Sequence, residues 1–136
     1  MVNSRLGHAQ IDIQTKNIAF YKDLFAFLGW KVEYEDANML GVVDRNGASL
    51  WFTGPLKECP NDYDGVGMNH LAIAVDVQAD VDEAVAYLKA HNVESLFDTP
   101  RHRPEFCSGP ERTYYQVMFE SPDRILFEVV YTGPKS

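Results

Sequence analysis

Cysteine and long apolar segments are scarce in this chain of 136 residues. Its two cysteines, Cys59 and Cys107, lie in different proline-containing stretches without CxxC spacing, which argues against a zinc knuckle or a disulfide framework. No stretch approaches the roughly 18 apolar residues of a membrane span, and the first residues lack the apolar core of a signal peptide. We therefore expect a cytoplasmic protein with reduced thiols.

Basic residues are also few: 12 Lys and Arg stand against 20 Asp and Glu, which gives a net charge of −8. Nucleic acids and anionic membranes require a concentrated basic surface, so we expect neither as a partner. The hydrophobic content of 46% is nevertheless enough to build a real core. At this length, residues 1–136 predict one domain.

What the chain does contain is a repeat. The stretch His8-Ala-Gln-Ile-Asp-Ile, followed by a helical pattern, returns as His70-Leu-Ala-Ile-Ala-Val, followed by a second helical pattern. Such self-similarity predicts a duplicated supersecondary unit. We expect one module over about residues 5–54, a Pro- and Gly-rich linker over about 55–67, and a second module over about 68–132.

The first half has the pattern βαβββ. Polar and apolar residues alternate strictly over residues 7–14, which predicts a strand. Apolar residues at helical spacing follow over residues 18–28, where Thr15 or Asn17 can cap the helix and Gly29 can end it. Three short strands are then expected, at residues 30–34, 39–43 and 48–53.

The second half repeats this order less regularly. Val81, Ala84, Val85 and Leu88 mark one face of its helix. Residues 98–110 are dense in proline and charge and predict a long loop that covers a functional site. The strands are expected at residues 69–75, 93–97, 113–119 and 125–131, followed by a polar tail at 132–136.

Three residues at matching places in the repeat can bind a metal. His8 and His70 head the first strand of each copy, and Glu128 lies in the last strand. Two histidines and one carboxylate commonly hold a divalent metal with coordination positions left open. The alternative interpretation is a related pocket without metal.

The chain resembles the vicinal oxygen chelate superfamily, also called the glyoxalase, bleomycin-resistance and extradiol-dioxygenase family. The resemblance covers essentially the whole chain. It rests on His8, on the helix ending Phe20-Tyr-Lys-Asp-Leu-Phe-Ala-Phe-Leu-Gly-Trp30, on Gly67-Met-Asn-His-Leu-Ala-Ile-Ala-Val75, and on Tyr114-Tyr-Gln-Val-Met-Phe-Glu-Ser-Pro-Asp-Arg-Ile-Leu-Phe-Glu-Val-Val-Tyr131.

The resemblance implies an α+β fold of two tandem βαβββ modules, whose mixed sheet forms a concave half-barrel with the helices outside. It also implies that His8, His70 and Glu128 are the metal ligands, with Zn, Ni, Mn or Fe as the metal. A homodimer is implied as well, so the three ligands come from one chain or from two. Arg124 departs from the pattern by standing where the family's turn has glycine.

Further residues share the implied concave face by strand alternation: Gln10, Asp12, Ser49, Trp51, Thr53, Tyr114 and Gln116. Asp12 is the best placed acid for proton transfer, with Gln10 as a second catalytic candidate. Trp51, Tyr114 and Gln116 are candidates for binding substrate, although packing or solvation also explains them. Arg103, in the basic loop, could clamp a carboxylate or phosphate, unless it is simply exposed.

These features favour a metal-dependent glyoxalase-like enzyme that chelates a small oxygen-rich metabolite, of the lyase, isomerase or thiol-transfer type. Trp51 stands where metal-binding members often carry a fourth carboxylate, which argues against a lactoylglutathione lyase. Two alternatives stay open: a non-enzymatic protein that binds an antibiotic or another small molecule, and an extradiol-type dioxygenase.

Overall fold

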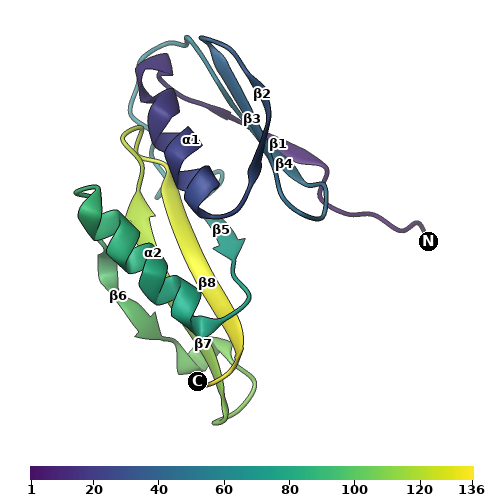
Figure 1. The fold of residues 1–136 in the computed structure, drawn as a ribbon, viewed down its shortest axis with the longest axis vertical. Coiled ribbons are helices and arrows are strands. Elements are labelled where there is room, and N and C mark those ends of the chain that lie inside the picture. Colours follow the sequence, from purple (N-terminus) through teal and green to yellow (C-terminus); the bar gives the residue numbers. More distant parts are fainter. The chain divides into compact units, whose positions relative to one another are not determined.

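The computed structural model describes all residues, 1–136, and divides into two compact units. The first unit is Met1–Pro60 and the second is Asn61–Ser136 (Figure 1). The boundary lies inside the segment 55–67 that the sequence indicates as a linker. The assignment of both units to one domain stays a prediction.

The first unit is a four-stranded sheet with one helix. The sheet has the order β1-β4-β3-β2, in which β1 and β4 are parallel and the other pairs are antiparallel. A short 3₁₀ turn, Thr15–Asn17, precedes the helix, and Asn17 makes no capping hydrogen bond through its side chain, contrary to our expectation. The elements are β1 (His8–Asp12), α1 (Ile18–Phe27), β2 (Lys31–Glu35), β3 (Met39–Val43) and β4 (Ser49–Thr53).

The second unit repeats this topology strand for strand. Its sheet has the order β5-β8-β7-β6, again with one parallel pair, β5 and β8. The tandem βαβββ arrangement predicted from the sequence is therefore confirmed. The elements are β5 (Leu71–Ala74), α2 (Gln78–Ala90), β6 (Leu96–His102), a 3₁₀ turn (Pro104–Phe106), β7 (Arg112–Glu120) and β8 (Leu126–Pro134).

Each helix packs its apolar stripe on one face of its own sheet. In the first unit, Tyr21 of α1 stacks on Phe52 of β4 with 4.4 Å between ring centroids, and both rings are fully buried. Because side chains alternate along a strand, Trp51 points to the opposite face. That face also carries Gln10, which lies beside Trp51 in register.

The same rule separates two faces in the second unit. Figure 1 shows α2 crossing the strands β7 and β8, and Tyr115 of β7 donates a hydrogen bond from its hydroxyl to Asp82 of α2 (2.7 Å). Tyr115 therefore marks the face that the helix covers. Tyr114 and Gln116 point to the other face by alternation, together with Glu128 of β8.

The observed bounds of β6 differ from the strand and from the loop that the sequence predicts here. Strand β6 runs over Leu96–His102, although the sequence predicts a strand at 93–97 and a loop from 98 onward. Phe97 and Asp98 both have positive φ, at 58° and 57°, and the register shifts between Leu96 and Arg101. Such a bulge and the proline at position 100 break the alternation by which a strand is recognised.

The Thr99 side chain forms hydrogen bonds to the backbone of both β6 and β7 at this bulge. Its hydroxyl donates to the carbonyl oxygen of Leu96 (2.6 Å) and accepts from the backbone N–H of Met118 (3.0 Å). Thr99 is only 8% exposed, so these backbone groups have little access to water. The side chain thus takes the place of a missing backbone partner.

We expect Thr99→Val to lower the free energy of unfolding by about 1–3 kcal/mol, because a buried N–H loses its acceptor without a change of shape. Urea denaturation would measure the loss. Thr99→Ser is the matched control, since it keeps the hydroxyl and should retain most of the stability. Equal stability of the valine variant and the wild type would contradict this role.

The C-terminal segment is also more ordered than predicted. Strand β8 extends to Pro134, so most of the expected polar tail at 132–136 belongs to the sheet. Gly133 pairs with Thr113, and the backbone N–H of Lys135 donates to the carbonyl oxygen of Glu111 (2.9 Å). The polar composition of the segment reflects exposure at the sheet's end rather than a lack of structure.

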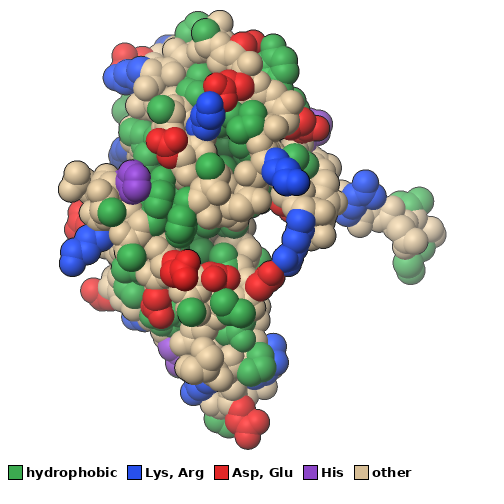
Figure 2. Space-filling view, viewed as in Figure 1, with side chains coloured by type: hydrophobic (Ala, Val, Ile, Leu, Met, Phe, Trp, Pro, Cys, Tyr) green, Lys and Arg blue, Asp and Glu red, His purple; other side chains and the backbone are tan.

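The surface carries mixed charge. On the face drawn in Figure 2, Lys and Arg side chains lie scattered among acidic and hydrophobic ones and form no continuous basic patch. None of the helices has the length and apolar character that crossing a membrane requires. The expectation that the protein binds no nucleic acid stays a prediction.

Candidate functional site

The second unit contains a cavity of about 450 Å³ on the sheet face opposite α2. This volume is in the range of sites for small molecules. Its lining combines aromatic and apolar side chains with polar groups from β7 and β8, from Arg103 directly after β6, and from the segment before β5. The lining residues are Tyr63, Asp64, Asn69, His70, Phe97, Arg103, Phe106, Tyr114, Gln116, Met118, Leu126 and Glu128.

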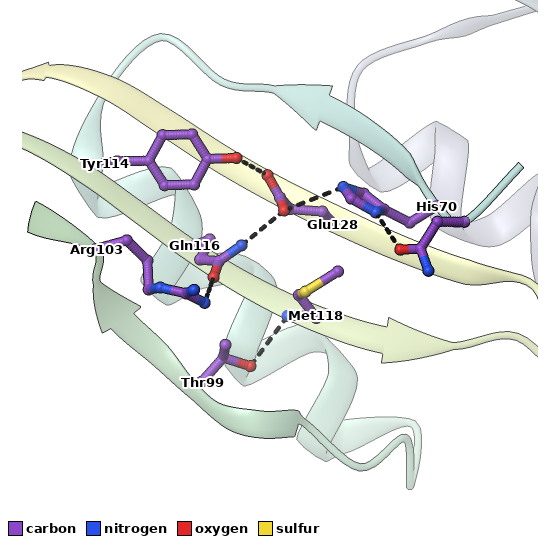
Figure 3. Close-up of polar contacts among 8 residues, drawn as sticks. His70, Thr99, Arg103, Tyr114, Gln116, Met118 and Glu128 are labelled. Carbon is purple, nitrogen blue, oxygen red and sulfur yellow. Dashed lines mark hydrogen bonds and ion pairs between the residues drawn. The ribbon is translucent and has the colours of Figure 1, made fainter. Parts of the chain in front are cut away.

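Glu128 is at the centre of the polar groups of the cavity and is only 2% exposed. Its Oε1 accepts a hydrogen bond from the Tyr114 hydroxyl (2.5 Å), and its Oε2 accepts one from Nε2 of Gln116 (2.6 Å). Gln116 in turn accepts from Nη1 of Arg103 through Oε1 (3.0 Å), as Figure 3 shows. Because Arg103 has no acceptor, it fixes which end of the Gln116 amide faces the carboxylate.

Tyr114 stays protonated in this arrangement. Burial, and then the hydrogen bond to Glu128 and the charge of that carboxylate, raise its pKa from 10.0 to about 12. A phenol is neutral below its pKa, so Tyr114 remains a hydrogen-bond donor throughout the physiological range. The carboxylate of Glu128 is therefore oriented by two neutral donors.

His70 is oriented by the residue before it. Nδ2 of Asn69 donates to the carbonyl oxygen of Tyr63 (2.9 Å), so its Oδ1 is the atom that faces Nδ1 of His70 at 2.7 Å. An amide oxygen can only accept, and Nδ1 must therefore carry the proton of the neutral imidazole. The lone pair then lies on Nε2, the form in which histidine binds a metal.

Nε2 of His70 faces Oε2 of Glu128, the carboxylate oxygen that also accepts from Gln116. Nε2 of His70 and Oε2 of Glu128 are 3.5 Å apart. Two ligand atoms at about 2.1 Å from one metal ion, at a tetrahedral angle, would be about 3.4 Å apart. The separation and the chemistry of this pair thus fit a shared divalent cation, while Asn69 contacts Nδ1 of His70 and Tyr114 donates to Oε1 of Glu128.

The third predicted ligand belongs to the first unit. His8 begins β1, where its side chain is exposed, and lies in register with Ser49. Neither unit by itself brings three or more His, Cys, Asp or Glu side chains close enough to hold a metal ion. The inclusion of His8 in a metal site stays a prediction.

The other candidates of the first unit form a network of their own. Nε2 of Gln10 donates to Oγ1 of Thr53 (3.0 Å) and lies 3.3 Å from Oδ1 of Asp12, which also accepts from Thr53 (3.2 Å). Trp51 lies flat over Gly41, and its indole N–H donates to the hydroxyl of Ser49 (3.1 Å). Asp12 and Gln10 are thus neighbours, as strand alternation predicts.

The structure groups five predicted site residues in one cavity: His70, Arg103, Tyr114, Gln116 and Glu128. Sequence reasoning missed Asn69 and Phe106. Asn69 precedes β5, outside the strict alternation that directs neighbouring side chains to opposite faces, and its position next to a candidate ligand was the available signal. Phe106 lies in the segment predicted as an irregular loop, where no periodicity marks it.

No protein-family model and no curated protein sequence matches the chain. Solved structures do. A candidate glyoxalase from Bacillus halodurans is 25% identical with a TM-score of 0.76, over 93% of this chain and 94% of that one. A lactoylglutathione lyase from Agrobacterium tumefaciens is 17% identical with a TM-score of 0.67, over 96% and 95%.

A third match contains a metal. The fosfomycin resistance protein FosX from Listeria monocytogenes, in complex with Mn(II) and sulfate, is 20% identical with a TM-score of 0.68, over 97% of this chain and 93% of that one. The low identities of the last two proteins show a shared fold rather than a shared activity. The likeness confirms the resemblance found in the sequence: the chain has the fold of the vicinal oxygen chelate superfamily.

Proposed function

We propose that the protein is a divalent-metal-dependent enzyme of the glyoxalase type, which acts on a small oxygen-rich metabolite. The observation that carries the proposal is the convergence of Nε2 of His70 and Oε2 of Glu128 at 3.5 Å, with every other hydrogen-bonding atom of the two side chains held in place. Zn, Ni, Mn and Fe are the candidate metals. The Mn(II) complex of FosX supports divalent-metal binding by this fold.

Each residue has a distinct part in this proposal. His70 and Glu128 hold the metal, with His8 as the third ligand. Tyr114 and Gln116 keep the carboxylate oriented, because both donate to it, Gln116 from a buried and Tyr114 from a partly buried position. When bound, the metal would polarise vicinal oxygens of the substrate.

Proton transfer needs a further group. Asp12 is an exposed carboxylate whose Oδ1 accepts from Thr53 (3.2 Å), and an ionised carboxylate can accept a proton from a substrate. Gln10, which lies beside it, would orient that carboxylate. We propose Asp12 as the proton acceptor, with Gln10 as its positioning residue and Trp51 as a substrate contact.

Turnover of a small substrate panel tests the proposal. The panel contains the hemithioacetal of methylglyoxal and glutathione, an epoxide offered with a thiol, and a catechol under oxygen. Protein loaded with each candidate metal is compared with the same protein after EDTA treatment and with His70→Ala. We expect turnover of the hemithioacetal or the epoxide that disappears on EDTA treatment and in the variant.

The other outcomes identify the alternatives. Oxygen consumption with the catechol, in the iron or manganese form, would replace the proposal by ring-cleaving dioxygenation. Tight binding of panel members or of bleomycin, without turnover and without any effect of EDTA, would make the protein a small-molecule binder and contradict an enzymatic role.

A further inference from the structure

Arg103 is the only Lys or Arg side chain that lines the cavity of the second unit. Three contacts hold its guanidinium. Nε donates to Oε1 of Glu105 (2.6 Å), Nη1 donates to Oε1 of Gln116 (3.0 Å), and the group lies over the Phe106 ring at 5.0 Å. An arginine held in this way has lost most of its side-chain freedom before any ligand arrives.

The contacts leave part of the guanidinium unused. Of its five N–H groups, Nε uses one on Glu105 and Nη1 uses one on Gln116, which leaves three at the Nη1 and Nη2 end. One N–H of Nη1 and one of Nη2 can together bind a carboxylate or phosphate bidentately. The side chain is 21% exposed, so these two N–H groups are partly desolvated and yet accessible.

Glu128 provides a second polar site in the same cavity. The Gln116 side chain separates Arg103 from Glu128, since its two amide atoms contact one residue each. An anion on Arg103 therefore occupies a different position from oxygens that approach His70 and Glu128. Phe97 and Phe106 also line the cavity and are 53% and 58% exposed, which leaves apolar surface for a ligand to cover.

We propose that Arg103 is an anion-binding specificity residue and that the substrate is bifunctional. One end carries vicinal oxygens, the other end carries a carboxylate or phosphate, and the part between them is apolar or aromatic. This proposal rests on the proposed function only in assigning the first end to the metal. Glu105 is 50% exposed, and its ion pair with Arg103 presents little barrier to a bound anion.

Binding to metal-free protein tests the anion site separately from metal chemistry. After EDTA treatment, calorimetry would compare 3-phenylpropanoate with its neutral amide, and phenethyl phosphate with phenethyl alcohol. We expect each anion to bind at least about 10-fold more tightly than its neutral analogue, as a charge-assisted hydrogen bond allows. The two pairs show whether the site prefers a carboxylate or a phosphate.

Three variants test whether Arg103 is the residue that binds the anions. Arg103→Gln should remove the preference for the anions, and Arg103→Lys should retain part of it. Arg112→Gln removes the same charge from an exposed position outside the cavity and should bind like the wild type. Circular dichroism confirms that each variant folds.

The proposal would be overturned by equal affinity for anions and neutral analogues, by an unchanged preference in Arg103→Gln, or by no binding at all. Failure of the metal-dependent turnover described above would not affect these binding experiments, because they contain no metal. Conversely, a wild-type protein that shows metal-dependent turnover but no preference for the anions would refute only the role of Arg103.

Discussion

Glu128→Gln is expected to lower the affinity for divalent metal at least about 100-fold, although the two side chains have nearly the same shape. Loss of an outer-sphere partner alone costs about 10- to 100-fold, and this change removes a proposed ligand atom's charge. The variant should also lose about 1 kcal/mol of stability, because a buried donor is left without an acceptor. A neutral amide is less costly to bury than a carboxylate, which keeps this loss small.

The directions of the hydrogen bonds to Glu128 explain why an amide at position 128 is less favourable than a carboxylate. Tyr114 and Gln116 each donate to one carboxylate oxygen, so an amide nitrogen at either position displaces one acceptor. Gln116 cannot compensate by turning over, because its amide nitrogen would then face the guanidinium of Arg103. Only a carboxylate at this position therefore accepts from both Tyr114 and Gln116.

In the double variant that combines Glu128→Gln with Gln116→Glu, each donor of this network again faces an acceptor. The new carboxylate accepts from Arg103 and from the new amide, whose oxygen accepts from Tyr114. We expect the double variant to recover most of the stability measured by urea denaturation, while metal affinity remains low because the charge no longer faces His70. Recovery of metal binding together with stability would contradict the assignment of Glu128 as a ligand.

Gly41→Ala is expected to destabilise the first unit by about 2 kcal/mol. A Cβ at Gly41 would lie 2.6 Å from the ring of Trp51, much closer than atoms can pack, so the indole must move. Overpacking of this kind costs about 1–3 kcal/mol. Thermal unfolding would measure the loss, and tryptophan fluorescence would report displacement of Trp51, since the protein has one other tryptophan, Trp30.

Two controls separate packing from backbone effects. Gly7→Ala introduces the same methyl group into open space, with nothing within 4 Å, and should change stability by no more than about 0.5 kcal/mol. In a Trp51→Leu background, Gly41→Ala should cost much less than in the wild type, because the two changes share one contact. A cost that is the same in both backgrounds would show that Trp51 does not restrict this position.

The sequence predicted the architecture because its two copies repeat the same signals. Strict alternation from Gly7 to Gln14 and the helical spacing of Tyr21 and Phe25 mark β1 and α1, and both elements are observed. The boundaries failed where local chemistry departs from a repeat. At β6, Thr99 supplies a backbone partner through its side chain, which no periodic pattern reveals.

The sequence predicted most residues of the candidate site but not the hydrogen bonds between them. Strand alternation placed Tyr114 and Gln116 on one face, and the repeat and the family resemblance indicated Glu128. Which atoms donate and which accept depends on distances that a sequence does not contain. The tautomer of His70, for example, follows from an amide orientation that the carbonyl oxygen of Tyr63 sets.

Arg124 shows how a departure from a family pattern can preserve geometry. It has φ of 56°, in the left-handed region that glycine adopts readily. The hydroxyl of Ser121 accepts from the backbone N–H groups of Asp123 (3.2 Å) and Ile125 (3.1 Å) and closes the turn. The turn is thus kept without glycine, at the cost of one strained residue.

Metal content per chain is the most direct test of the proposal that His70 and Glu128 share a divalent cation. Plasma mass spectrometry would be applied to the wild type, to His70→Ala and to His91→Ala, after reconstitution with Zn, Ni, Mn or Fe and removal of free ion. His91 lies at the end of α2, contacts Tyr87 and does not line the cavity, so it controls for loss of a histidine. We predict about one ion per chain in the wild type and in His91→Ala, and background levels in His70→Ala; equal metal content in all three proteins, or background levels in the wild type, would contradict it.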